Sequence, residues 1–102
     1  MEIDFQYTLS DQEARSRLEL LGKYLENKHG IKVTWNDDKK AKFSGKYLMV
    51  KIEGELAVGS SHAIFKGEDP GFLLRSRAKD YIHGKLSAYL DPKTPIDKLP
   101  TS

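Results

Sequence analysis

The chain has 102 residues, of which 38% are hydrophobic and 31% charged, and it contains no cysteine. This length accommodates one domain, the composition is that of a globular protein, and the lack of cysteine excludes disulfides, thiol nucleophiles and thiolate zinc sites. The formal net charge is only +2, with acids and bases interspersed, which argues mildly against nucleic-acid binding. The amino terminus shows no signal-peptide pattern, so we expect cytoplasmic residence.

An alternating strand followed by a capped helix is predicted at the start of the chain. Residues 2–9 alternate between apolar and polar side chains, which is the period of a half-buried strand. Ser10 and Glu13 match a capping box at the start of a helix, and Gly30 is typical of the residue that follows a helix end. Glu13 and Arg17 are expected to pair on the exposed side of this helix. The apolar stripe consists of Ala14, Leu18, Leu21 and Leu25.

Two shorter strands are predicted next. The second strand covers residues 31–35 and ends at the turn sequence Asn36-Asp37-Asp38. The third strand is expected to be short, at residues 41–44, with the chain reversing at Gly45 and Lys46.

A long fourth strand is predicted over residues 48–58, because every even position there is apolar or glycine. Gly54 within it indicates a bulge, a bend or a close approach by another group. Ser60 and Ser61 are expected in the turn that follows, and a fifth strand covers residues 62–66. Its register stays open because three apolar residues are consecutive there.

The second helix is predicted to start at Asp69 and Pro70, as a cap residue followed by a proline in the first turn. Residues 92–102 are rich in proline and are expected to form a flexible tail after a single domain of residues 1–91. The fold class is therefore α+β, with an antiparallel sheet of about five strands in the order β-α-β-β-β-β-α and two amphipathic helices on one face. The apolar stripe of the second helix consists of Leu74, Ala78, Tyr81, Ile82, Leu86, Tyr89 and Leu90.

Groups suited to catalysis or metal binding are few. None of His29, His62 and His83 has the spacing of a compact metal site, and His29 is expected to support the end of the first helix as a cation. Ser60 and Ser61 are adjacent to His62 in the sequence, but an extended segment points neighbouring side chains to opposite faces. We therefore expect no catalytic residue, no metal, no cofactor and no enzymatic activity.

The most basic stretch of the chain offers an alternative, nucleic-acid-binding interpretation. Its lysines could contact phosphates, and its tyrosine offers a ring on which a base could stack. The simpler interpretation is a charged hairpin that protects a sheet edge from pairing with another chain. The residues concerned are Lys39, Lys40, Lys42, Lys46 and Tyr47.

Short motifs follow one another along most of the chain. They are Gly30-Ile31-Lys32-Val33-Thr34-Trp35, the strand around Phe43, Ile52-Glu53-Gly54-Glu55-Leu56-Ala57-Val58, Gly71-Phe72-Leu73-Leu74, Tyr81-Ile82 and Leu90-Asp91. Over about residues 3–91 the sequence resembles the small bacterial polyhydroxyalkanoic-acid-system proteins. It departs from their pattern in a longer segment between Phe43 and Ile52, and in Asp69-Pro70-Gly71, which replaces an apolar lead into the second helix. The resemblance implies a non-catalytic association with polyester storage granules or their metabolism.

Three kinds of partner follow from these patterns. The resemblance implies a granule surface or a hydrophobic acyl ligand held between the sheet and the second helix. The same order of elements also occurs in small RNA-binding and ribosome-associated domains, which is the second alternative. The third is a scaffold that forms a homodimer through a sheet edge or through the face that carries Tyr47 and Met49. No membrane span is expected. An apolar cavity would favour ligand binding, whereas a packed core with a basic face would favour RNA.

Overall fold

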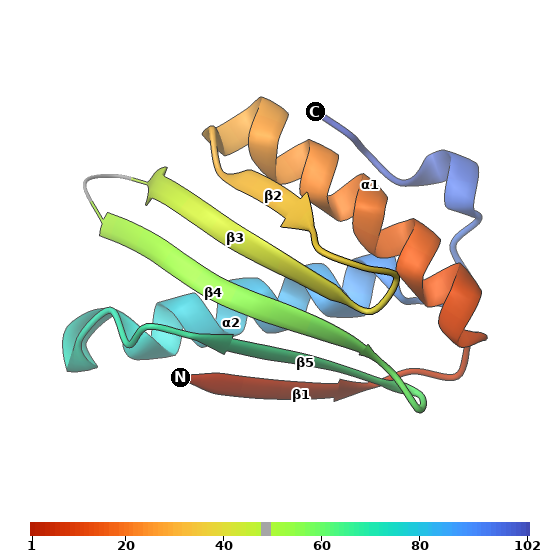
Figure 1. Cartoon of the computed structure of the whole chain (residues 1–102), viewed down its shortest axis with the longest axis horizontal. Coiled ribbons are helices and arrows are strands. Elements are labelled where there is room, and N and C mark those ends of the chain that lie inside the picture. The colour runs from red at the N-terminus through yellow and green to blue at the C-terminus, as the bar shows by residue number, and fades with distance from the viewer. Residues whose placement is uncertain (48–49) are drawn as a thin grey trace.

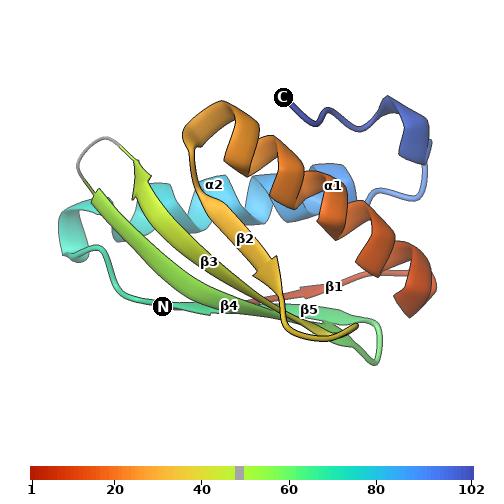
Figure 2. The same cartoon turned by 45° about the horizontal axis from the view of Figure 1, so that its top comes forward.

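A computed structural model describes residues 1–47 and 50–102, with only the backbone described at Tyr47 and Val50. Five antiparallel strands form one sheet in the order β1-β5-β4-β3-β2, and both long helices lie on the same face of it (Figures 1 and 2). The α+β class and the predicted order of elements are confirmed. The elements are β1 (Glu2–Gln6), α1 (Asp11–His29), β2 (Lys32–Trp35), β3 (Lys40–Tyr47), β4 (Val50–Gly59), β5 (His62–Gly67), α2 (Phe72–Tyr89) and the 3₁₀ helix η1 (Ile96–Lys98).

Helix α1 crosses the sheet from β1 at one edge to β2 at the other (Figure 1). The predicted caps are confirmed, since the Ser10 hydroxyl accepts a hydrogen bond from the Glu13 amide at 3.1 Å and Gly30 has a φ of 70°. The predicted exposure of Arg17 is wrong: its pair with Glu13 forms, but Arg17 is only 3% exposed. Arg17 is buried because its guanidinium also donates to the carbonyls of Tyr89 and Asp91 at the end of α2.

Strand β3 is longer than predicted and does not reverse at Gly45 and Lys46. Gly45 pairs with Ile52 inside the β3–β4 ladder, which continues to the pair of residues 47 and 50. Glycine is required at position 45 for another reason: a Cβ there would lie 3.0 Å from the Cα of Ile31. The first two residues of the predicted fourth strand, Leu48 and Met49, lie outside the described residues.

Ser60 and Ser61 lie in the turn between β4 and β5, as predicted, and they form a two-residue hairpin loop. Gly59 pairs with His62, and Ser60 and Ser61 both have positive φ angles, of 53° and 66°. This combination is typical of the turn that matches the twist of an antiparallel hairpin. The open register of β5 is also settled, because Ala63 and Phe65 are buried on the helix-covered face.

Helix α2 starts at Phe72, later than predicted. Asp69 does not cap it, because its carboxylate accepts the Gly71 amide at 2.9 Å and pairs with Arg75 at 2.6 Å. Gly71 then takes the N-cap position with a φ of 98°, a left-handed conformation that excludes it from the helix.

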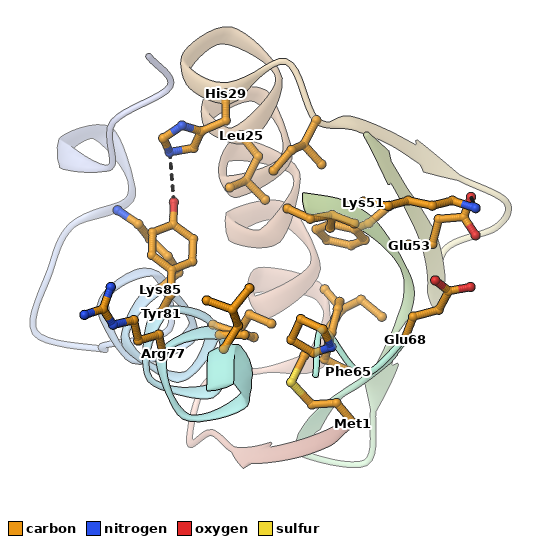
Figure 3. Close-up of a pocket in the computed structure, with 18 of the residues that line it drawn as sticks. Met1, Leu25, His29, Lys51, Glu53, Phe65, Glu68, Arg77, Tyr81 and Lys85 are labelled. Carbon is orange, nitrogen blue, oxygen red and sulfur yellow. Dashed lines mark hydrogen bonds and ion pairs between the residues drawn. The ribbon is translucent and has the colours of Figure 1, made fainter. Parts of the chain in front are cut away.

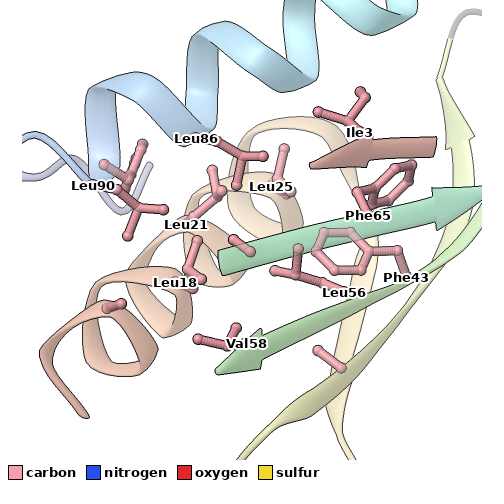
Figure 4. Close-up of a cluster of buried hydrophobic side chains, with 14 of the residues drawn as sticks. Ile3, Leu18, Leu21, Leu25, Phe43, Leu56, Val58, Phe65, Leu86 and Leu90 are labelled. Atoms are coloured by element: carbon pink, nitrogen blue, oxygen red, sulfur yellow. The ribbon is translucent and has the colours of Figure 1, made fainter. Parts of the chain in front are cut away.

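The core fills the space between the sheet and the two helices (Figure 4). Leu18, Leu21 and Leu25 of α1 pack against Leu56 of β4, and Leu86 closes this cluster from α2.

The segment after α2, which the sequence predicted to be a flexible tail, makes specific contacts. Leu99 is only 8% exposed, because it joins the core cluster. The Tyr89 hydroxyl donates to the Pro100 carbonyl, and the Asn27 side chain donates to the Thr101 carbonyl at 2.8 Å. These contacts join the end of the chain to the core and to α1, and the flexibility of residues 92–102 stays a prediction.

Candidate functional site

A largely apolar cavity of about 510 Å³ lies between the inner face of the sheet, the end of α1 and one side of α2 (Figure 3). Its volume is in the range of small-molecule binding sites. Aromatic and aliphatic residues of the sheet and of both helices form its walls. Among them are Phe43, Leu56, Phe65, Leu21, Leu25, Leu74, Ala78, Ile82 and Leu86.

Two glycines allow the aromatic ring that forms the floor of this cavity to lie directly against the backbone of the sheet. Gly54 of β4 pairs with Gly67 of β5. A Cβ at Gly54 would lie 2.7 Å from Cζ of Phe65, and one at Gly67 would lie 2.8 Å from Cε1 of the same ring. The Phe65 ring therefore covers both glycines, and Phe43 meets it edge to face at 5.8 Å. Of the three roles predicted for Gly54, the close approach by another group is confirmed.

The roof of the cavity is helix α2, which is more deeply buried at its C-terminal end than along its first turns. Leu86 and Tyr89 near its C-terminus are each 2% exposed, whereas Leu74 and Tyr81 are 38% and 40% exposed. The predicted apolar stripe therefore has two functions. Leu86, Tyr89 and Leu90 complete the core, and the residues of the stripe from Leu74 to Leu86 line the cavity.

The mouth of the cavity carries unlike charges on its two sides (Figure 3). Lys51, Glu53 and Glu68 border the sheet side, where Lys51 and Glu53 form an ion pair at 3.4 Å. Arg77 and Lys85 border the helix side. Within the described ranges, no ion pair joins either of these two cations to an acid.

Aromatic rings hold Lys85 and its neighbours at the helix side of the mouth. The Lys85 ammonium lies 4.3 Å from the ring centre of Tyr24 and 5.6 Å from that of Tyr81. The Tyr81 hydroxyl lies 3.1 Å from Nε2 of His29 (Figure 3). Burial, followed by the charges of Lys28 and Lys85, lowers the pKa of His29. The predicted cationic role of His29 at the helix end is therefore not supported, since the neutral form is favoured.

The other residues singled out in the sequence lie away from the cavity. His62 contacts Asp4 at 2.7 Å, His83 packs edge-on against Phe5 at 5.5 Å, and the described residues hold no cluster of three metal-binding side chains. Ser60 and Ser61 donate their backbone amides to Asp11 rather than facing a base.

The lysines of the predicted nucleic-acid surface lie on the outer face of the sheet, which the helices do not cover, or in the turn before β3. Lys40, Lys42 and Lys46 alternate along β3 with the buried Ala41 and Phe43, so they face away from the core. Lys39 lies in the preceding turn, and for Tyr47 only the backbone is described. Lys42 stands opposite Glu55 of β4, so an acid lies directly beside the basic row, whereas Lys46 stands opposite Lys51.

Sequence reasoning did not identify the residues of the cavity mouth. Arg77, Tyr81 and Lys85 follow one another at spacings of four residues on α2, so they share one side of the helix with the apolar stripe. A lysine on the edge of such a stripe, one turn from a tyrosine, was the available signal. His29 could not be assigned to the site, because α1 and α2 meet only in the folded chain.

These features define a small α+β domain with an apolar cavity between its helices and its sheet. The chain belongs to the polyhydroxyalkanoic acid system protein family, whose family model (PHA_gran_rgn) matches residues 1–93. That description states no activity and no ligand. Searches of curated proteins and of solved structures gave no significant match. Neither long helix, among the residues that the structure describes, is long and apolar enough to cross a membrane.

Proposed function

We propose that this protein is a non-catalytic binding module of the polyhydroxyalkanoic acid system that holds a hydrophobic acyl ligand in the cavity under α2. The observation that carries the proposal is the cavity itself, of about 510 Å³ and lined by aliphatic and aromatic side chains. An apolar cavity left open beside a well-packed core is typical of a ligand site, because unfilled apolar volume costs stability. It also favours ligand binding over the RNA alternative.

Membership of this family supports the proposal that the ligand is an acyl chain. A protein of a polyester storage system encounters hydroxyacyl chains and their polymer, which are largely hydrocarbon. Each methylene buried in the cavity contributes about 0.8 kcal/mol, so a medium-length chain suffices for tight binding.

The test is to fill the cavity from α2. Ala78 lines the cavity, whereas Ala88 is an exposed residue of the same helix. The uncharged fluorescent probe N-phenyl-1-naphthylamine should bind the wild-type protein with increased emission. The Ala78→Phe variant should bind it at least about tenfold more weakly, since loss of two or more methylene contacts is worth this much.

The matched control is Ala88→Phe, which adds the same ring outside the cavity and should leave probe binding unchanged. Circular dichroism establishes that both variants are folded. Equal probe binding by the two variants, or no binding by the wild type, contradicts the proposal.

A second candidate function is attachment to the granule surface. Phe72 and Leu73, at the start of α2, are 78% and 79% exposed, and such neighbouring large apolar side chains are typical of a contact surface. Co-sedimentation with polyhydroxybutyrate granules tests this function. The double variant Phe72→Ser, Leu73→Ser should lose co-sedimentation while keeping the wild-type thermal midpoint. Retained co-sedimentation would exclude this surface as the attachment site.

A further inference from the structure

The two sides of the cavity mouth differ in charge, and this difference restricts the ligand. Glu53 and Glu68 lie on the sheet side together with two cations: Lys51, which pairs with Glu53, and the N-terminal ammonium of Met1, which donates to the Gly67 carbonyl. Arg77 and Lys85 lie on the helix side, and no ion pair with an acid in the described part of the chain engages them. An anionic group at the mouth is therefore attracted by the helix side, whereas acids and cations are mixed on the sheet side.

Of the two cations on the helix side, Lys85 is better placed than Arg77 to bind an anionic group. Its side chain is half-buried, and its ammonium is held near the rings of Tyr24 and Tyr81 rather than extending freely into water. A cation that has lost part of its hydration gains more from an anion than a fully exposed one does. Leu86, the next residue, lies in the cavity wall, so the charge is directly beside the apolar lining.

We propose that the cavity takes a single acyl chain with a free carboxylate, whose head is held by Lys85 and Arg77. The hydrocarbon chain extends from the mouth to the floor formed by Phe43 and Phe65. This inference rests on the proposed function and specifies its ligand: a fatty or hydroxy-fatty acid, and not an ester or the polymer chain. The arrangement follows because the aromatic residues of the sheet and the two cations of α2 line the same cavity.

The test compares decanoate with methyl decanoate, which have the same chain and differ in the charge of the head. Displacement of N-phenyl-1-naphthylamine measures both affinities. The wild type should bind decanoate about tenfold or more tightly than the ester, since a hydrogen bond to a charged group is worth roughly this factor. Lys85→Met, which keeps the length of the side chain, should lose most of this preference and retain the affinity for the ester.

The matched control is Lys79→Met, because Lys79 is an exposed cation of the same helix that does not line the cavity. This variant should keep the preference for decanoate. Arg77→Gln provides a second measurement on an exposed residue and should reduce the preference by severalfold.

The outcomes separate the two proposals. Equal binding of acid and ester by the wild type, abolished by Ala78→Phe, would overturn the carboxylate assignment and leave the cavity as a ligand site. Absence of binding by either compound or by the probe would overturn both proposals. A preference for decanoate that survives in both Lys85→Met and Arg77→Gln would overturn the assignment of the head group to these residues.

Discussion

Asp11 is the residue that joins three parts of the backbone through one side chain. Its carboxylate accepts the Tyr7 hydroxyl at 2.6 Å and the amides of Ser61 and Ser60 at 3.0 and 3.1 Å. It thereby ties the β4–β5 turn to the junction of β1 and α1. The hydrogen bond from Tyr7, followed by that from Ser61, lowers the pKa of Asp11, because all these donors favour the charged form.

This lowered pKa predicts a loss of stability in acid. The pKa of Asp11 in the unfolded chain is about 3.9. Its contribution is therefore complete above that pH and is lost as the pH falls through the lower folded-state value. The Asp11→Asn variant should be less stable than wild type at pH 7 and should lose less on acidification. Urea titrations from pH 7 to pH 2 measure both effects, and Asp80→Asn, an exposed carboxylate of α2, is the control. A parallel pH dependence of wild type and Asp11→Asn would contradict this role.

Replacing Gly54 and Gly84 by alanine should change the stability of the protein in opposite directions. In Gly54→Ala the new methyl group would meet the Phe65 ring at 2.7 Å and the Lys66 carbonyl at 2.9 Å, so we expect a loss of about 1–3 kcal/mol. Gly84 lies in α2 with no atom within 4 Å of an added Cβ. Gly84→Ala should therefore raise stability by up to about 1 kcal/mol. Urea midpoints compare the two, and equal effects would show that Phe65 moves aside.

At the scale of elements, α2 depends on a cation supplied by α1. The last carbonyls of a helix lack partners within it, and Arg17 donates to two of the groups at this end, the carbonyls of Tyr89 and Asp91. The roof of the cavity is thus held by its C-terminal end, while its first half remains more exposed.

The Arg17→Met variant should lose about 1.5–3 kcal/mol, because the buried carbonyls lose hydrogen bonds to a charged group. Amide exchange should accelerate first in the last turn of α2. Lys23→Met, an exposed cation on the same helix, should change stability by less than about 0.5 kcal/mol. Unchanged exchange at the end of α2 in Arg17→Met would indicate that the helix does not need this anchor.

Local patterns predicted most elements, because alternation, capping and turn chemistry act over a few residues. The caps at Ser10 and Gly30 and the serine turn depend only on neighbouring residues, and all three are confirmed. The misassigned positions depend on distant parts of the chain. Arg17 is buried by the end of α2, and Gly45 is needed for the approach of Ile31.

The sequence predicted where a cavity could lie, between the sheet and the second helix, but not which residues form its floor and its mouth. Its floor depends on the Gly54–Gly67 pair, which the register of β4 and β5 creates. Its mouth combines His29 of α1 with Tyr81 and Lys85 of α2. No local pattern brings these residues together, so their relation appears only in three dimensions.

At the scale of the whole molecule, the outer face of the sheet bears on the RNA alternative. Its cations are interleaved with acids, as where Lys42 stands opposite Glu55 and where Lys66 lies 3.8 Å from Glu2. Such a mixed surface should release few counterions on binding a polyanion. We expect weak binding to double-stranded RNA and a shallow dependence of log K on log salt, measured by fluorescence anisotropy. A steep slope, lost on replacing Lys40, Lys42 and Lys46 by Gln, would instead support RNA binding.

The pairing of β1 with β5 also determines the order in which the chain can fold. Met1 and Gly67 bind each other across 66 residues, whereas β2 to β5 form successive hairpins. During synthesis the N-terminal strand therefore emerges with Ile3 and Tyr7 uncovered and waits until the last strand has been made. In that interval β1 has no partner strand within its own chain, and an unpaired strand is a site at which another chain can add by backbone hydrogen bonds.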